Sequence, residues 1–131
     1  MSGSKMATWE MVCKIVSSLP GTELDTDRQG RPTWRVDGRP ILRRFAQLRV
    51  PEEEALLEAR GEVLAIGVDP GLREALLQQD PQTFFVTAMW SKRHAVLVWL
   101  ESIAFDELRE LIIEAWQTRA SKARMRREGL P

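Results

Sequence analysis

The dipeptide Asp37-Gly38 constrains the fold more than any other short stretch of this sequence. It separates two strand-like runs, residues 33–36, where apolar and polar side chains alternate, and residues 39–46. Asp-Gly is favoured in two-residue turns between antiparallel strands because both turn positions take positive φ angles. Pro40 cannot donate to a strand ladder, so it favours an edge strand or the first positions of a strand. The sequence therefore predicts an antiparallel hairpin.

Three further segments have the apolar spacing of amphipathic helices. The first begins at Thr8, a preferred N-cap residue, and ends where Pro20 and Gly21 interrupt the pattern. The second begins at Asp69-Pro70, with aspartate as the cap and proline in the first helical position. The third carries a stripe of Phe105, Leu108, Leu111, Ile112, Ala115 and Trp116. We expect a helix at each place, with Trp116 as a core anchor.

The remaining chain supplies strands and connections. Residues 62–68 are apolar and β-branched, which is typical of a buried strand, and residues 83–89 and 95–100 are two more candidate strands. Residues 23–30 contain Asp, Thr and Gly and are expected to form a loop. Residues 47–60 are expected to be a connection whose acidic run is compatible with a helical turn. The predicted fold is α+β: a two-layer antiparallel sheet in the order helix, three strands, helix, two strands, helix.

The length of 131 residues suits one domain with one core. We expect a flexible N-terminal tail over residues 1–7, a domain over 8–118 and a basic C-terminal tail over 119–131. The sequence has no apolar run near the ~18 residues of a membrane span and no start that resembles a secretory signal. We therefore expect a cytoplasmic protein without a membrane partner. The single cysteine, Cys13, cannot form an internal disulfide.

Charge is balanced overall but unevenly distributed. The chain has 19 basic and 19 acidic residues, yet residues 28–49 hold seven arginines against one acid, Asp37. Residues 50–80 hold eight acids against two arginines, and residues 119–131 hold five basic residues against Glu128. Such blocks predict two basic surfaces and one acidic surface. Solvated faces that keep the protein monodisperse are an equally good interpretation.

The basic hairpin suggests contact with nucleic acid. Arginine side chains match phosphate groups, and loops next to a hairpin can reach a duplex such as DNA. Strand alternation places Arg35 on the face opposite Trp34, so Trp34 is expected in the core rather than free to stack on a base. The candidate nucleic-acid-binding residues are Arg28, Arg31, Arg35, Arg39, Arg43, Arg44, Lys92 and Arg93. Zero net charge weakens this interpretation, since dedicated nucleic-acid binders are usually basic overall. The alternative is a protein-interaction or regulatory module that uses the sheet face and its charged segments to meet a partner or a second copy.

Residues suited to catalysis are few. The sequence has one histidine, one cysteine and no tyrosine, and its glycines form no phosphate-binding loop. Neither His94 nor Cys13 has metal-ligand partners at suitable spacing, and the adjacent acids Glu52, Glu53 and Glu54 point their side chains in different directions. We therefore expect a protein that is not an enzyme and has no metal and no cofactor.

The sequence resembles the MmcQ/YjbR family of small bacterial proteins from residue 6 to about residue 122. The resemblance is carried by residues 19–23 (LPGTE), 32–36 (PTWRV), 68–70 (VDP), 80–87 (DPQTFFVT), 96–100 (VLVWL), 106–111 (DELREL) and 114–116 (EAW). It implies an α+β double-wing fold related to frataxin-like and secretion-chaperone-like domains, and a DNA-binding role without an established activity. The family's Pro-His-Tyr and Gly-Tyr-Pro pattern is replaced here by Ala-Met-Trp-Ser-Lys-Arg-His over residues 88–94, so no family role passes to His94.

Overall fold

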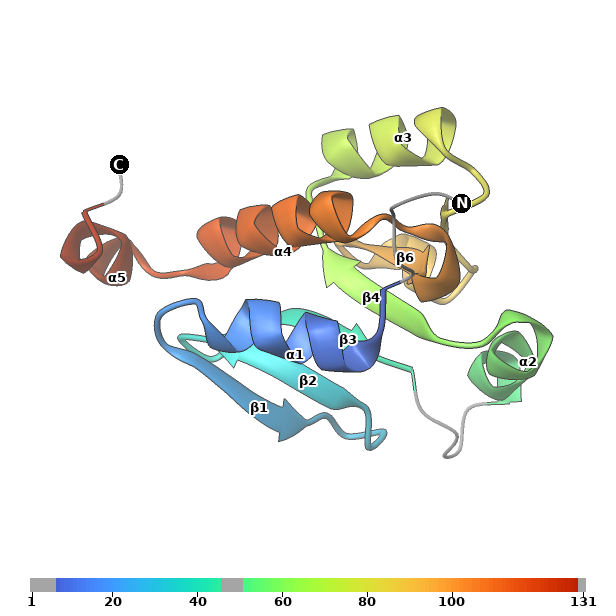
Figure 1. Cartoon of the computed structure of the whole chain (residues 1–131), viewed down its shortest axis with the longest axis horizontal. Helices are drawn as coiled ribbons and strands as arrows, with labels where there is room; N and C mark the ends of the chain where they lie inside the picture. The colour runs from blue at the N-terminus through green and yellow to red at the C-terminus, as the bar shows by residue number, and fades with distance from the viewer. Residues whose placement is uncertain (1–6, 46–50, 130–131) are drawn as a thin grey trace.

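A six-stranded antiparallel sheet is the centre of the computed structural model, which describes residues 7–45 and 51–129. The strands lie in the order β1-β2-β3-β4-β6-β5. Strands β1 to β4 and β6 are labelled in Figure 1. Their bounds are β1 Thr22–Thr26, β2 Pro32–Val36, β3 Arg39–Arg44, β4 Val63–Gly67, β5 Phe84–Phe85 and β6 Ala95–Trp99. The turn between β2 and β3 takes positive φ at both Asp37 (51°) and Gly38 (79°), which confirms the predicted hairpin.

Five helices complete the described part of the chain: α1 Trp9–Ser17, α2 Pro51–Arg60, α3 Pro70–Gln79, α4 Phe105–Arg119 and α5 Lys122–Arg127. The predicted caps form, because the side chains of Thr8 and Asp69 accept hydrogen bonds from the backbone N–H groups of Met11 and Leu72. Two short 3-10 turns, η1 Trp90–Lys92 and η2 Leu100–Ser102, flank β6.

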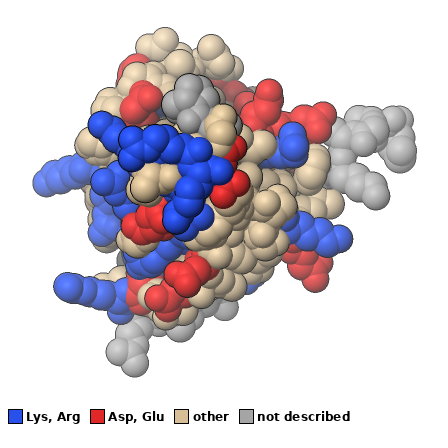
Figure 2. All heavy atoms as spheres, turned by 90° about the vertical axis from the view of Figure 1, so that its left-hand side faces the viewer, with Lys and Arg blue, Asp and Glu red and all other residues tan. Residues whose placement is uncertain are grey.

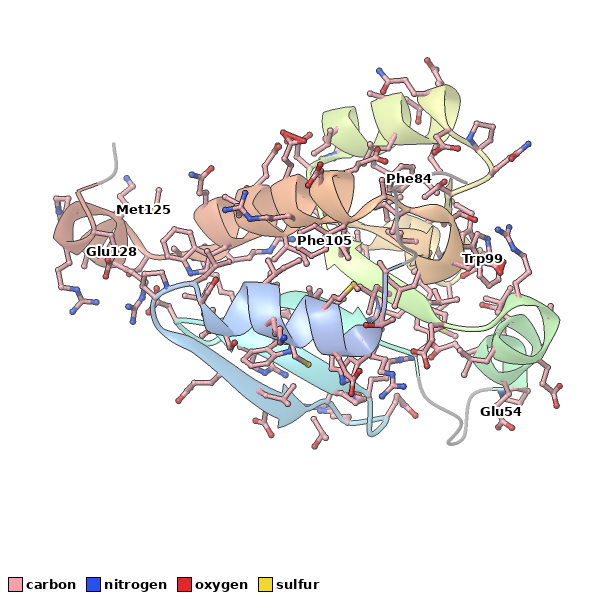
Figure 3. All side chains as sticks on the ribbon, in the orientation of Figure 1. Glu54, Phe84, Trp99, Phe105, Met125 and Glu128 are labelled. Carbon is pink, nitrogen blue, oxygen red and sulfur yellow. The ribbon has the colours of Figure 1, made fainter. Side chains whose placement is uncertain are left out.

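The two faces of the sheet are covered differently. α1 and α4 pack against each other on the first face, above the larger core that includes Trp34 and Trp116 (Figure 1). A smaller core lies on the second face, where Ala65, Leu97 and Trp90 meet the inner side of α2. Trp99 belongs to this smaller core and lies beside α2 (Figure 3). The rest of the second face, toward β1 and the hairpin turn, carries the polar features described below.

The fold class is the one expected, while several elements differ in extent. Strand β1 takes up the first half of the loop that was predicted over residues 23–30. Its side chains are mostly exposed, so the sequence shows no apolar alternation that would indicate pairing with β2. The acidic connection contains the ten-residue helix α2, and the strand expected over 83–89 is only β5. Residues 46–50, which include the end of the second predicted strand and Arg49, lie outside the described residues, as do residues 1–6. Ala7, assigned to the N-terminal tail, is buried in the larger core.

The segment expected as a basic tail contains α5, which contacts the hairpin turn. The Asp37 carboxylate accepts hydrogen bonds from the Ser121 N–H at 2.8 Å and from Arg124 Nε at 3.1 Å. Met125 packs against the larger core, and Figure 3 shows it on α5 near the end of the molecule. The isolated sequence could not reveal this contact, because the aspartate that holds α5 is 84 positions away from Ser121.

Candidate functional site

A cationic hollow lies on the second face of the sheet, where β2, β3, the loop after β1 and the segment after η1 converge. It has a volume of about 300 Å³. It is lined by five arginines, one glutamine and one aspartate: Asp27, Arg28, Gln29, Arg31, Arg35, Arg43 and Arg93. We call it the arginine hollow. Five of the eight predicted nucleic-acid-binding residues therefore come together around one space.

The sheet register explains how β2 and β3 contribute arginines to the lining of the arginine hollow. Arg43 lies opposite Thr33 on β2 and opposite Ala65 on β4, and Ala65 belongs to the core of the second face. Alternation places Arg35, two residues after Thr33, on the same side. A register shift between Trp34 and Arg35 then pairs Arg35 with Pro40. Both arginines thus leave the sheet on the face that α1 and α4 do not cover.

Asp27 organises the loop after β1, which lines part of the arginine hollow. Its Oδ1 accepts hydrogen bonds from the backbone N–H groups of Gln29 and Arg31, each at 2.9 Å. Its Oδ2 accepts a third bond from Arg31 Nη1, also at 2.9 Å. Burial alone would raise the pKa of Asp27, but these bonds and the Arg31 charge lower it below its ordinary value. Asp27 therefore remains ionised, and it is the one carboxylate that the described residues contribute to the hollow's lining.

Arg31 is a structural residue, which corrects its assignment as a phosphate contact. Its side chain is 4% exposed and forms a bidentate pair with Glu53 of α2, which is 1% exposed. Burial opposes the charge of Arg31, but the hydrogen bonds to Glu53 and Asp27 outweigh it and raise the pKa of Arg31. Its guanidinium thus donates to two carboxylates of this chain, Glu53 and Asp27. Its role is to tie α2 to the loop beneath the hollow.

Arg43 is a half-buried charge whose carboxylate partner lies at a distance. Its side chain is 20% exposed, and its Nε is 3.7 Å from Asp27 Oδ2, too far for a hydrogen bond. Within the described part of the chain, this buried Nε has no hydrogen-bond partner. Burial is the main cause that lowers the pKa of Arg43, and the nearby charges of Arg93, Arg31 and Arg35 lower it further against the opposing effect of Asp27. An anion placed here would relieve this repulsion.

Arg93 is positioned by an aromatic ring. Its guanidinium lies 4.6 Å from the centroid of Trp90, which is 1% exposed, while Arg31 lies 5.2 Å from the same centroid. Contacts of this length between a guanidinium and an indole are attractive. The Arg93 carbonyl also accepts a hydrogen bond from Arg73 Nη1 at 2.6 Å. Arg93 is therefore held at the rim of the hollow by both its side chain and its backbone.

A second hollow of about 220 Å³ shares Arg43 and Arg93 with the first. It is mostly apolar, and its lining is Pro40, Ile41, Leu42, Arg43, Ala65, Gly67, Trp90, Arg93, His94, Ala95 and Arg119. We call it the apolar hollow. Gly67 leaves room for Arg119, since a Cβ at this position would overlap the Arg119 guanidinium. Arg119 Nη2 also donates to the His94 carbonyl at 3.2 Å.

Three predicted residues lie outside the arginine hollow. Arg44 pairs with Glu62 at 2.7 Å, and its guanidinium lies over the Trp9 ring at 5.3 Å. Arg39 is exposed beside the hairpin turn, and Lys92 is exposed in η1. The view onto the end of the molecule that carries α5 shows Lys and Arg gathered on one side, with Asp and Glu among them (Figure 2). This end is thus not a purely basic surface.

Asp27, Trp90 and Arg119 contribute to the two hollows, and sequence reasoning did not select any of them. Trp90 was seen only as part of a connection, and Arg119 as the start of a tail. Only the fold brings these residues to Arg43, because no pattern in the sequence links them.

Among residues 7–45 and 51–129, no three His, Cys, Asp or Glu side chains are grouped to hold a metal ion. No helix in the same residues is long and apolar enough to cross a membrane.

Comparison with known proteins identifies the family. The family model YjbR matches residues 17–118. The uncharacterised proteins Mb2600 of Mycobacterium bovis and Rv2570 of Mycobacterium tuberculosis are each 38% identical over 123 residues, which cover 89% of this chain and 92% of theirs. The crystal structure of Deinococcus radiodurans protein DR2400, a DUF419 domain, superposes with a TM-score of 0.70 at 20% identity and covers 96% of this chain and 91% of its own. The chain therefore belongs to the YjbR family.

Proposed function

We propose that this protein is a non-enzymatic binding protein that contacts the phosphates of a nucleic acid through the arginine hollow. The observation that carries the proposal is the environment of Arg43. This half-buried guanidinium has one distant carboxylate and is surrounded by three other arginines. Folding has gathered like charges in a concave site, where an anion with several oxygen atoms would find donors on more than one side.

Among anions, phosphate best matches the arginines that line the arginine hollow. A guanidinium presents its N–H donors in a planar fork that matches two oxygens of a phosphate group. Arg35 and Arg93 approach the space from different elements, β2 and the segment after η1, so they can bind neighbouring oxygens or neighbouring phosphates. Because the described part of the chain contributes one carboxylate and five arginines to the lining, repulsion of a phosphate is weak.

A catalytic role has little support from the arrangement of side chains. His94 is exposed beside the apolar hollow on the second face, whereas Cys13 packs against the larger core on the first face. These two residues therefore cannot act as a nucleophile and its base. The proposal assigns binding, not turnover, to the site.

The alternative is association with a protein or with a second copy of this chain. It is favoured by the exposed carboxylates of Glu52 and Glu58 on α2, which offer a surface of opposite charge to the arginine hollow. Complementary patches of this kind steer association and weaken with salt. Sedimentation of the purified protein at low and high salt would detect such self-association.

Fluorescence anisotropy with labelled oligonucleotides at ~50 mM salt tests the main proposal. Binding should weaken with salt at a log–log slope of about −0.7 per phosphate contact for a single strand. Arg35→Ala and Arg93→Ala should each lower the affinity and reduce the steepness of that slope by about 0.7. Arg109→Ala is the matched control, because it removes the same charge from the exposed side of α4, which covers the other face. No binding at tens of micromolar protein, or equal losses in all three variants, would refute the proposal.

A further inference from the structure

We propose that the protein binds single-stranded nucleic acid, with one unpaired base in the apolar hollow and its phosphate in the arginine hollow. This inference rests on the proposed function and adds the class of nucleic acid and the part of it that enters each hollow. It starts from the fact that the two hollows are neighbours, because Arg43 and Arg93 line both of them.

The apolar hollow has the chemistry of a base-binding site. Ala65 and Ala95 form part of its wall from adjacent strands, and Pro40 adds another apolar surface. Among the described residues, its lining includes no carboxylate, and its charged members are arginines. A guanidinium can stack on a base and also donate hydrogen bonds to ring nitrogens and carbonyl oxygens. A flat, partly apolar group with acceptor atoms at its edge fits these surroundings.

The size of the hollow limits what enters. Its volume of about 220 Å³ is smaller than the roughly 300–1,000 Å³ of pockets that hold drug-sized ligands. It therefore suits a fragment such as one base rather than a base pair. A base within a duplex would have to leave its stack first, which costs a few kcal/mol, whereas an unpaired base is already accessible. Single strands should therefore bind more tightly than duplexes.

The shared arginines link the two halves of the ligand. A base and its own phosphate are joined by one sugar, so the two groups must bind side by side. Arg93 is held at this boundary by the Trp90 ring, and Arg43 emerges between the hollows from β3. An occupant of the apolar hollow would thus carry its phosphate toward Arg43, whose buried Nε has no hydrogen-bond partner among the described residues.

The decisive experiment compares two single strands of equal length in the anisotropy assay. One is oligothymidylate and the other has the same phosphates but abasic sugars, so only the base contacts differ. The strand with bases should bind roughly tenfold more tightly, within the range of base contacts in single-strand binding proteins. Ala65→Leu, which fills the apolar hollow, should weaken binding of oligothymidylate more than binding of the abasic strand and so remove the difference between them. Trp fluorescence and circular dichroism check that the variant folds.

The outcomes separate the two proposals. If both strands bind equally, with the salt dependence expected for phosphate contacts, the base pocket is refuted and phosphate binding stands. A duplex of the same length is measured in the same assay. If it binds more tightly than oligothymidylate, the predicted preference for single strands is refuted. If none of the nucleic acids binds, the proposed function fails and the base pocket fails with it. Should Ala65→Leu not fold, the comparison of the two strands on the unchanged protein still decides.

Discussion

Replacing Glu53 by alanine should destabilise the fold far more than replacing an exposed carboxylate. Glu53 accepts from Arg31 Nε at 2.8 Å and from Arg31 Nη2, and both side chains are at least 96% buried. The Glu53→Ala variant leaves two donor groups of a buried guanidinium without acceptors, and Asp27 alone remains as its counter-charge. Breaking a buried ion pair from one side costs about 3–5 kcal/mol of unfolding free energy.

The chain offers a matched control in the Arg44–Glu62 pair. This pair has the same bidentate geometry, with bonds of 2.9 and 2.7 Å, but its side chains are 33% and 42% exposed. Solvent replaces the lost partner there, so Glu62→Ala should cost only about 0.2–1 kcal/mol. Both values are measured by urea denaturation followed by tryptophan fluorescence.

The double variant Arg31→Met with Glu53→Met tests the physical reason. Because it removes both buried charges, it should recover part of the stability that Glu53→Ala loses. A loss below about 1 kcal/mol for Glu53→Ala, similar to that of Glu62→Ala, would show that burial does not set the strength of this pair. A double variant less stable than Glu53→Ala would show that the cost comes from packing rather than from the unpaired charge.

Three further predictions concern the packing of the helices and Arg119. Trp116→Ala should cost about 3–5 kcal/mol in urea denaturation, because the side chain is 2% exposed and its Nε1 donates to the Pro20 carbonyl at 2.9 Å. The hydrogen bond from the Ser121 N–H, ahead of that from Arg124, lowers the pKa of Asp37 in the folded state, although burial opposes it. The contribution of Asp37 to stability is therefore present above its unfolded pKa of about 3.9 and is lost as the pH falls through its folded pKa. Asp37→Asn should accordingly reduce the loss of unfolding free energy at acidic pH. Gly67→Ala should displace the Arg119 guanidinium, which is the flexible end of a side chain. The unfolding free energy should fall by less than about 1 kcal/mol. Hydrogen exchange should show faster local opening at the end of α4, where Arg119 contacts the His94 carbonyl.

Local patterns were sufficient to predict most of the sheet and three of the helices. The Asp37-Gly38 turn, the caps at Thr8 and Asp69, and the apolar run that becomes β4 each specify structure through nearby residues. β1 was missed because four of its five residues are exposed, so its pairing with β2 leaves no apolar alternation in the sequence. Trp34 was correctly assigned to the core, where it is 8% exposed.

The candidate site was only partly predictable, since a count of arginines does not reveal their partners. Arg31 and Arg43 looked equivalent in the sequence, but Arg31 is neutralised by Glu53, which lies 22 positions away on α2. Arg43 has no comparable partner among the described residues and shares Asp27 at 3.7 Å. The difference depends on which acid the fold brings to each arginine, and periodicity contains no information about that.

Gathering Arg35, Arg43 and Arg93 around one space works against folding, because their repulsion lowers the stability of the native state. Two features counter this repulsion in part: Glu53 neutralises the neighbouring Arg31, and the Trp90 ring holds the guanidinium of Arg93. Unfavourable interactions that are offset by the surrounding structure are more typical of functional sites than of solvated surfaces. A solvated basic face would let its arginines spread into water, as Arg39 does at the hairpin turn. In the arginine hollow, by contrast, Arg43 is half-buried and Arg93 keeps its guanidinium against the Trp90 ring.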